Sequence, residues 1–192
     1  MRPTTKFPGV LATGLLLTMV VVPVAADEER GRVTTRLTGY QETPLTINSP
    51  ARGEFRASIG AGGTVIEYEL TYRDLSSPIT QSHIHFGRPA ITGGIVLFLC
   101  TNLAPPAGVP APQACPNAPA TITGALTALN VIAVPGQGID SGAAGFAEML
   151  KAIQAGAAYV NVHTTNHPSG EIRGPLGDRD DRRGVRGRAH DE

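Results

Sequence analysis

The chain has no tryptophan, and aromatic residues make up only 5% of its 192 residues. Common catalytic and nucleotide-binding motifs are missing as well. There is no P-loop, no Gly-x-Gly-x-x-Gly after a strand, and no Gly-x-Ser-x-Gly nucleophile elbow. Lysine is scarce, and beyond Lys6 the only one is Lys151, on a predicted helix where it serves as a surface charge. These absences argue against nucleotide-dependent enzymes and serine hydrolases.

Residues 1–26 have the pattern of a secretory signal peptide. Arg2 and Lys6 give a positive start, the apolar stretch Val10–Val22 follows, and Val24-Ala25-Ala26 offers small residues for cleavage. The apolar stretch is too short for a bilayer, which needs about 20 residues. We therefore expect a secreted or extracytoplasmic protein of the cell envelope, with no transmembrane anchor after signal cleavage.

The remaining charges do not define a partner. Without Arg2 and Lys6 the 16 basic residues become 14, against 16 acidic ones, which leaves a formal charge of −2. This balance gives no electrostatic support for nucleic acid or an anionic membrane as a partner. The length suits one domain, which we place at residues 33–176. A charged leader, 27–32, precedes it, and a charged tail, 177–192, is expected to be disordered.

Glycine and proline are abundant, with 23 and 16 residues, and short apolar or alternating stretches recur between them. This pattern predicts an all-β fold, an antiparallel Greek-key or immunoglobulin-like sandwich or barrel. Only the segment 143–155 has apolar residues at helical spacing, with Ser141 as its N-cap and Gly156 as its terminator. The predicted strands span residues 51–59, 64–72, 79–86, 94–100, 120–129, 158–164 and 170–176.

The first two predicted strands form a hairpin around the glycine-rich turn 60–63. Both strands alternate apolar and polar residues, so one face of the hairpin is buried. We expect Ile59 to pair with Thr64, because this register matches apolar with apolar and positive with negative residues. It sets Phe55 opposite Tyr68 in the core, and Arg56 opposite Glu67 in solvent.

The two cysteines, Cys100 and Cys115, flank a segment dense in proline and alanine. In an exported protein such a pair is expected to form a disulfide. Closing a loop of about 15 residues would contribute about 3 kcal/mol in the chain-entropy model. The alternative is a pair of thiolate metal ligands, but oxidising surroundings and the wide spacing argue against it.

Histidines on two predicted strands are the strongest functional signal. His83 and His85 stand at i and i+2, so their side chains share one face, with Cα atoms about 6.5–7 Å apart. Both imidazoles could then reach one metal ion at about 2.0–2.1 Å. His163 on a later strand is the candidate third ligand, and His167 in the following turn is a weaker fourth. If His163 lay on a different sheet from His83, the shared site would fail.

The last two predicted strands supply neighbours for this site. If their apolar residues share the core face, His163 pairs with Glu171, and Asn161 pairs with Arg173 on the polar face. A carboxylate beside an imidazole fixes its tautomer and orients it as a metal ligand. The same residues also suit an ordinary surface network, and histidines on the solvent face of a strand commonly bind nothing.

Four motifs resemble the chordin-type (CHRD) domain family and follow the family's order over about residues 33–176. The resemblance implies an extracellular β-sandwich-like module, which occurs as repeats in animal chordins that sequester growth factors and singly in exported bacterial proteins. This chain has one copy and lacks the cysteine-rich modules of chordins, so growth-factor antagonism is not carried over. The family also offers no catalytic residues to transfer. The motifs are Leu37-Thr-Gly-Tyr-Gln-Glu-Thr-Pro44, Ser82-His-Ile-His-Phe-Gly87, Ala155-Gly-Ala-Ala-Tyr-Val-Asn-Val-His-Thr164 and Pro168-Ser-Gly-Glu-Ile-Arg-Gly174.

Two functions are compatible with these residues. The first is a non-catalytic extracytoplasmic binding or interaction module with an unknown partner or ligand. The alternative is a copper- or zinc-binding protein that uses His83, His85 and His163, since imidazole ligands favour these metals over calcium or magnesium. The His-x-His strand is also similar to that of Cu,Zn superoxide dismutases, which are antiparallel β-barrels. That likeness covers few residues and lacks the zinc loop, so dismutase-like redox activity is the lesser expectation.

Overall fold

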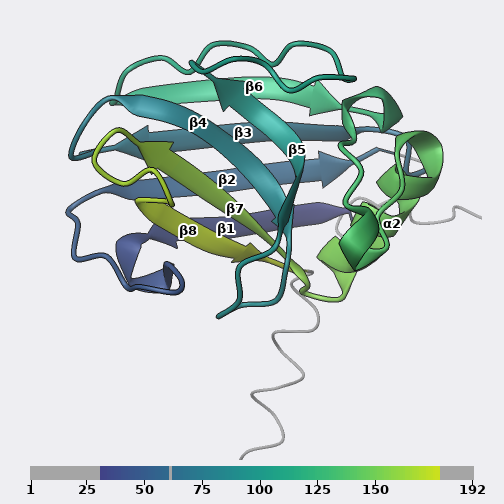
Figure 1. Cartoon of the computed structure of the whole chain (residues 1–192), viewed down its shortest axis with the longest axis horizontal. Coiled ribbons are helices and arrows are strands. Elements are labelled where there is room, and N and C mark those ends of the chain that lie inside the picture. The colour runs from purple at the N-terminus through teal and green to yellow at the C-terminus, as the bar shows by residue number, and fades with distance from the viewer. Residues whose placement is uncertain (1–30, 61, 178–192) are drawn as a thin grey trace, which may run out of the picture.

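One antiparallel sheet of eight strands curls into a nearly closed barrel with a short helix at one end (Figure 1). The computed structural model describes residues 31–177 except Ala61. The predicted signal peptide, most of the leader and nearly all of the tail lie outside the described residues. The elements are β1 Arg32–Thr38, β2 Arg52–Ile59, β3 Ile66–Arg73, β4 Ile79–Phe86, β5 Gly94–Thr101, β6 Ala120–Leu126, α2 Gly142–Gln154, β7 Ala158–Thr164 and β8 Ile172–Leu176, with short 3₁₀ turns at Gly39–Gln41, Ala128–Asn130 and Pro135–Gln137.

The strand order is β5-β4-β7-β8-β1-β2-β3-β6, so strands distant in the chain, such as β4 and β7 or β1 and β8, pair within the sheet, and the consecutive strands β5 and β6 form its two edges. The inner face holds the hydrophobic core, in which Leu37, Leu70 and Ile84 are fully buried. The all-β prediction is confirmed, in its barrel form. Strand β1 was not predicted, because it has only Val33 and Leu37 as strongly apolar residues. It nevertheless lies inside the sheet, between β8 and β2.

The hairpin of β2 and β3 forms, but its predicted register is wrong by two residues. Ile59 pairs with Ile66, since the turn extends to Val65, whose carbonyl accepts a hydrogen bond from the Gly60 amide at 3.0 Å. A shift of two keeps every side chain on its face, which is why the faces were predicted correctly. The observed partners are Phe55 with Leu70, Ala57 with Tyr68, and Arg56 with Glu69.

Helix α2 forms at the predicted place and covers one end of the barrel (Figure 1). Its apolar face buries Phe146, Met149 and Ile153. Ser141 is the N-cap residue, although its side chain makes no capping hydrogen bond. Gly156 ends the helix in the left-handed conformation, φ 65°, which favours glycine.

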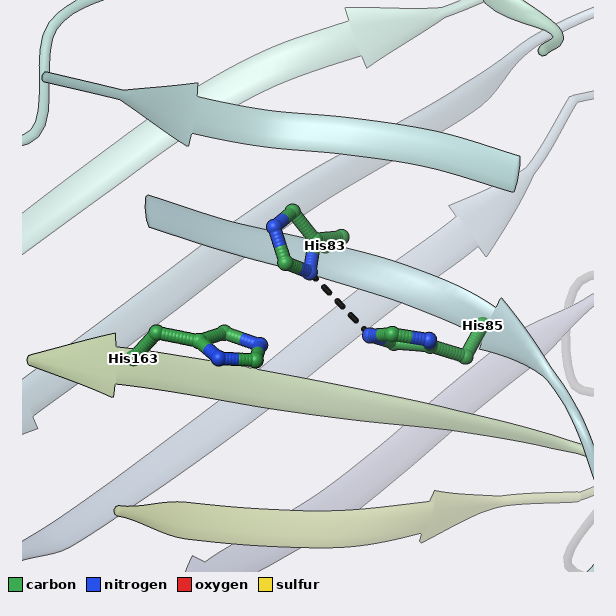
Figure 2. Close-up of side chains that lie close together, drawn as sticks. All are labelled: His83, His85 and His163. Carbon is green, nitrogen blue, oxygen red and sulfur yellow. Dashed lines mark hydrogen bonds between the residues drawn. The ribbon is translucent and has the colours of Figure 1, made fainter. Parts of the chain in front are cut away.

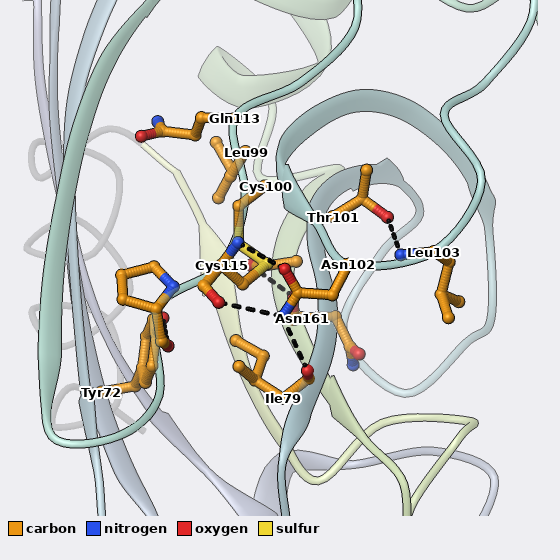
Figure 3. The surroundings of a disulfide bond; sticks show 12 residues. Tyr72, Ile79, Leu99, Cys100, Thr101, Asn102, Leu103, Gln113, Cys115 and Asn161 are labelled. Carbon is orange, nitrogen blue, oxygen red and sulfur yellow. Dashed lines mark hydrogen bonds between the residues drawn. A yellow bond between two sulfur atoms is a disulfide. The ribbon is translucent and has the colours of Figure 1, made fainter.

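The predicted disulfide between Cys100 and Cys115 is present and lies near the seam where the two sheet edges, β5 and β6, face each other (Figure 3). The loop that it closes spans this seam with hydrogen bonds. The Gln113 side chain donates to the Tyr68 hydroxyl and to the Thr123 carbonyl, both at 2.9 Å, and its carbonyl accepts from the Thr101 amide. The loop therefore substitutes for direct pairing between β5 and β6.

Candidate metal centre

Neighbouring strands bring the three predicted histidines together. Strands β4 and β7 pair directly, with Asn161 opposite His83 and Tyr159 opposite His85. Residues that oppose each other across an antiparallel pair point to the same face, so His83, His85 and His163 share one face of the sheet. Figure 2 shows the three rings turned toward one another. The condition that His163 lies beside the strand of His83 is met.

This face is the outer one, because Ile84, Val160 and Val162 occupy the barrel core. The alternative of histidines exposed on the solvent face of a strand does not hold, because these side chains are buried. His83 is 0% exposed, and His85 and His163 are each 6% exposed.

Three loops cover this outer face, and each contacts a residue of the cluster or its border. The loop after β1 brings Glu42 against Asn161, whose amide nitrogen donates to both carboxylate oxygens at 3.0 Å. The loop after β4 places the Gly93 carbonyl 3.0 Å from Nδ1 of His85. The loop after β7 places the Pro168 carbonyl 2.9 Å from Nδ1 of His163. Loops far apart in sequence therefore exclude water from one site.

Gly93 is required at its position. A Cβ atom there would lie 1.8 Å from the Phe86 carbonyl oxygen, so only glycine lets this loop approach β4 closely enough to bind His85.

Spacing within the cluster suits a metal ion. One ligand nitrogen from each histidine can be chosen so that all three lie within 4.8 Å of one another. Nδ1 of His83 is 3.1 Å from Nε2 of His85. Two nitrogens bound to one ion at about 2.0–2.1 Å with tetrahedral angles are about 3.3 Å apart. The His83 and His85 rings are therefore close enough to share an ion once the hydrogen bond between them is broken.

The hydrogen bonds define the tautomers. A carbonyl oxygen only accepts, so Nδ1 of His85 and Nδ1 of His163 each carry the proton, and each Nε2 is unprotonated. His83 then donates its Nδ1 proton to Nε2 of His85. Nε2 of His83 and Nε2 of His163 are buried and have no hydrogen-bond partner among the described residues. Binding of the second ring nitrogen to a backbone carbonyl is typical of histidines that ligate metals.

All three imidazoles are held neutral, which is the form that binds metal. Burial lowers the pKa of His83 to about 2, and repulsion from His163 and His85 adds to the effect. Burial also lowers the pKa of His85, to about 4, although the Gly93 carbonyl acts in the opposite direction. The pKa of His163 is lowered by burial as well.

Aromatic and cationic groups hold His85 in place. Its ring stacks on Tyr159 with a centroid separation of 4.5 Å and an interplanar angle of 6°. The guanidinium of Arg173 lies 3.4 Å from the Tyr159 ring centroid, a cation–π contact. Arg173 itself donates to the carbonyls of Arg88 and Ile91 in the loop after β4. The predicted pairing of Asn161 with Arg173 is confirmed.

The predicted contact between Glu171 and His163 does not form. The Glu171 carboxylate accepts hydrogen bonds from Thr164, Ser49 and Ser76 instead. Strand β8 begins at Ile172, two residues later than predicted, so Glu171 lies just outside the β7–β8 ladder. The backbone carbonyl of Pro168 takes the orienting role that was expected of this carboxylate.

Glu42 was not singled out by any spacing in the sequence, yet it is 5% exposed and borders the cluster through Asn161. Burial raises the pKa of Glu42 to about 7, against opposing effects of the Asn161 hydrogen bond and the Arg173 charge. Oδ1 of Asn161 has no partner among the described residues. His167, the weaker fourth candidate, is not among the cluster residues of the described chain.

Fold and site together define a small β-barrel domain with a buried three-histidine cluster under loops on its outer face. None of the helices in the described part is long and apolar enough to cross a membrane. The family model of the CHRD domain matches residues 33–176. The chain therefore belongs to the CHRD domain family, as the motifs predicted. No similar protein was found among curated proteins or solved structures.

Proposed function

We propose that this chain is an exported CHRD-domain binding module whose ligand is a copper or zinc ion held by His83, His85 and His163. One observation supports this most: three buried, neutral imidazoles converge, and two of their nitrogens lack hydrogen-bond partners among the described residues. A buried polar atom without a partner costs about 1–3 kcal/mol, and a metal ion would offset this cost. An all-imidazole donor set favours copper or zinc.

Export is supported by two features. The signal pattern of residues 1–26 would direct the chain out of the cytoplasm. The disulfide between Cys100 and Cys115 suits an oxidising compartment.

A purely structural role for the histidines explains less. Histidines kept only for packing or hydrogen bonding are expected to have their buried nitrogens satisfied, unlike those of His83 and His163.

No fourth His, Cys, Asp or Glu of the described chain joins the group. Three protein ligands would leave one position for water or a small ligand. We assign no catalytic residue.

Metal analysis of the purified protein tests the proposal. The protein is loaded with Cu²⁺ or Zn²⁺, freed of excess metal, and analysed by plasma mass spectrometry. One metal ion per chain is expected for the wild type. The triple variant His83→Ala/His85→Ala/His163→Ala is expected to retain none, because it lacks all three ligands.

Two further variants keep the experiment decisive if the triple variant unfolds. His163→Gln removes one ligand at similar volume and should bind metal at least about tenfold more weakly. His167→Ala, the matched control, removes a histidine outside the cluster and should bind as the wild type does. No stoichiometric uptake by the wild type, or equal uptake by the triple variant, contradicts the proposal.

A further inference from the structure

A groove of about 740 Å³ runs over the outer face of β1, β2, β3 and β6, and no histidine lines it. Its polar lining combines arginines with threonine hydroxyls. Three guanidinium groups, from Arg36, Arg52 and Arg73, contribute to it, together with a single carboxylate, that of Glu54.

Two of the arginines form a cross-strand pair of like charge, which is unusual in a sheet. Arg52 on β2 lies directly opposite Arg73 on β3, and like charges in that position destabilise a sheet. Arg36 lies on β1 opposite Glu54, in the adjacent row of the same face. This arrangement concentrates positive charge on the outer face without stabilising the sheet.

Nearby acids neutralise this charge only in part. Both Glu54 oxygens accept hydrogen bonds from Arg56 at 3.1 Å, so that carboxylate is already paired. Asp74 forms an ion pair with Arg73, which leaves Arg36 and Arg52 as the groove arginines without a carboxylate partner among the described residues. Within the described part of the chain, the Arg52 side chain donates only to the uncharged carbonyls of Ser49 and Ala51.

Arg36 adds an unpaired positive charge to the groove. Its side chain has no ion-pair or hydrogen-bond partner among the described residues. A neighbouring hollow on the same face is balanced by comparison, since two arginines there meet two glutamates. These are Arg32, Arg56, Glu67 and Glu69.

We infer that this groove binds an acidic polysaccharide, whose carboxylate or sulfate groups pair with the guanidiniums. Guanidinium binds such oxyanions in bidentate fashion. The hydroxyls of Thr38, Thr71 and Thr121 line the same groove and suit a hydroxyl-rich chain. Its largest apolar residues, Leu37 and Tyr72, are 0% and 2% exposed. The groove therefore has neither the apolar anchor pockets typical of peptide binding nor a stacking platform for nucleic acid bases.

Calorimetric titration with alginate, dextran sulfate, neutral dextran and poly-glutamate tests this inference. The wild type is expected to bind alginate or dextran sulfate, with affinity that falls as salt rises. Whichever of the two binds more tightly identifies carboxylate or sulfate as the preferred group. Neutral dextran should not bind, and poly-glutamate should bind at least about tenfold more weakly.

Arg36→Gln/Arg73→Gln removes two charges from the groove and is expected to weaken binding about tenfold or more. Arg32→Gln/Arg88→Gln removes two exposed arginines elsewhere and is the control of equal net charge. Circular dichroism melting confirms that both variants fold. Absence of polysaccharide binding, equal weakening by both variants, or binding of poly-glutamate as tight as that of the polysaccharides overturns the inference. The last result would assign the groove to an acidic peptide.

Discussion

Glu42 and Glu171 are both buried, yet their surroundings move the pKa in opposite directions. Burial alone would raise the pKa of Glu171, but hydrogen bonds from Ser49, Ser76 and Thr164 outweigh it and lower the pKa. Burial raises the pKa of Glu42 to about 7, since the Asn161 hydrogen bond and the Arg173 charge compensate only in part. Hydrogen-bond donors around the carboxylate therefore decide the direction of the shift at Glu171, whereas burial decides it at Glu42.

Replacing Glu42 with Gln is expected to stabilise the protein at pH 8 by about 1–3 kcal/mol. At this pH the wild-type carboxylate is ionised in a site that disfavours its charge. Gln is neutral, and its amide can donate to Oδ1 of Asn161, which has no partner among the described residues. Because the folded pKa is raised above 4.5, the gain is largest above pH 7 and shrinks as pH falls and Glu42 takes up a proton.

Urea unfolding at pH 8 and at pH 5.5 measures this difference. Glu67→Gln, at an exposed position of β3, is the matched control and should change stability by less than about 0.5 kcal/mol. A loss of stability for Glu42→Gln at pH 8 would show that the ionised carboxylate is the favoured form.

At the scale of elements, the seam between β5 and β6 depends on the disulfide loop. Gln113 in this loop contacts residues of β3, β5 and β6, and Tyr68 on β3 reaches the Leu99 carbonyl on β5 at 2.7 Å. The edges are joined by side chains and a loop in place of a strand ladder. The seam is therefore the part of the barrel that is expected to open first.

Removal of the disulfide in Cys100→Ala/Cys115→Ala should lower the free energy of unfolding by about 3 kcal/mol, because the unfolded chain gains loop entropy. Urea unfolding gives the total effect, and hydrogen exchange locates it. Amides of β5 and β6 should exchange faster, whereas those between β1 and β2 should change only as global stability does. Uniform acceleration along the whole sheet would argue against a local role at the seam.

At the scale of the whole molecule, the buried histidines make folding depend on pH. The folded pKa values of His83 and His85 are lowered to about 2 and about 4 from an ordinary value of 6.5. Below pH 6.5 the histidines of the unfolded chain therefore bind protons, whereas those of the folded chain stay neutral. The free energy of unfolding falls as pH drops toward the folded pKa values. Each histidine contributes about 1.4 kcal/mol per pH unit. Glu42 opposes this between about pH 7 and 4.5, as a single group.

The metal-free protein should therefore lose on the order of 2–4 kcal/mol between pH 7 and pH 5. Urea unfolding across this range measures the loss. His163→Gln should show a shallower decline, because it removes one group that resists protonation in the fold. Stability that is constant or rises toward pH 5 would contradict the neutral, buried state of the cluster.

Alternation of side chains made much of the architecture predictable. Seven strands and helix α2 follow from local patterns, and the disulfide follows from two cysteines in an exported context. Strand β1 was not predicted, because its two strongly apolar residues are too few to show an alternating pattern. The β2–β3 register was wrong because turn length depends on Val65, which local patterning placed in the strand.

By itself, the sequence determined that His83 and His85 share a face, because strand periodicity requires it, and its motifs identified the CHRD domain. Only the tertiary structure decided that β7 lies beside β4 and that three distant loops bury the histidines. It also decided that Glu171 binds hydroxyls and that Glu42 borders the cluster. The physical reason is one of range: periodicity acts over neighbouring residues, whereas burial and pKa depend on segments that meet only when the barrel closes.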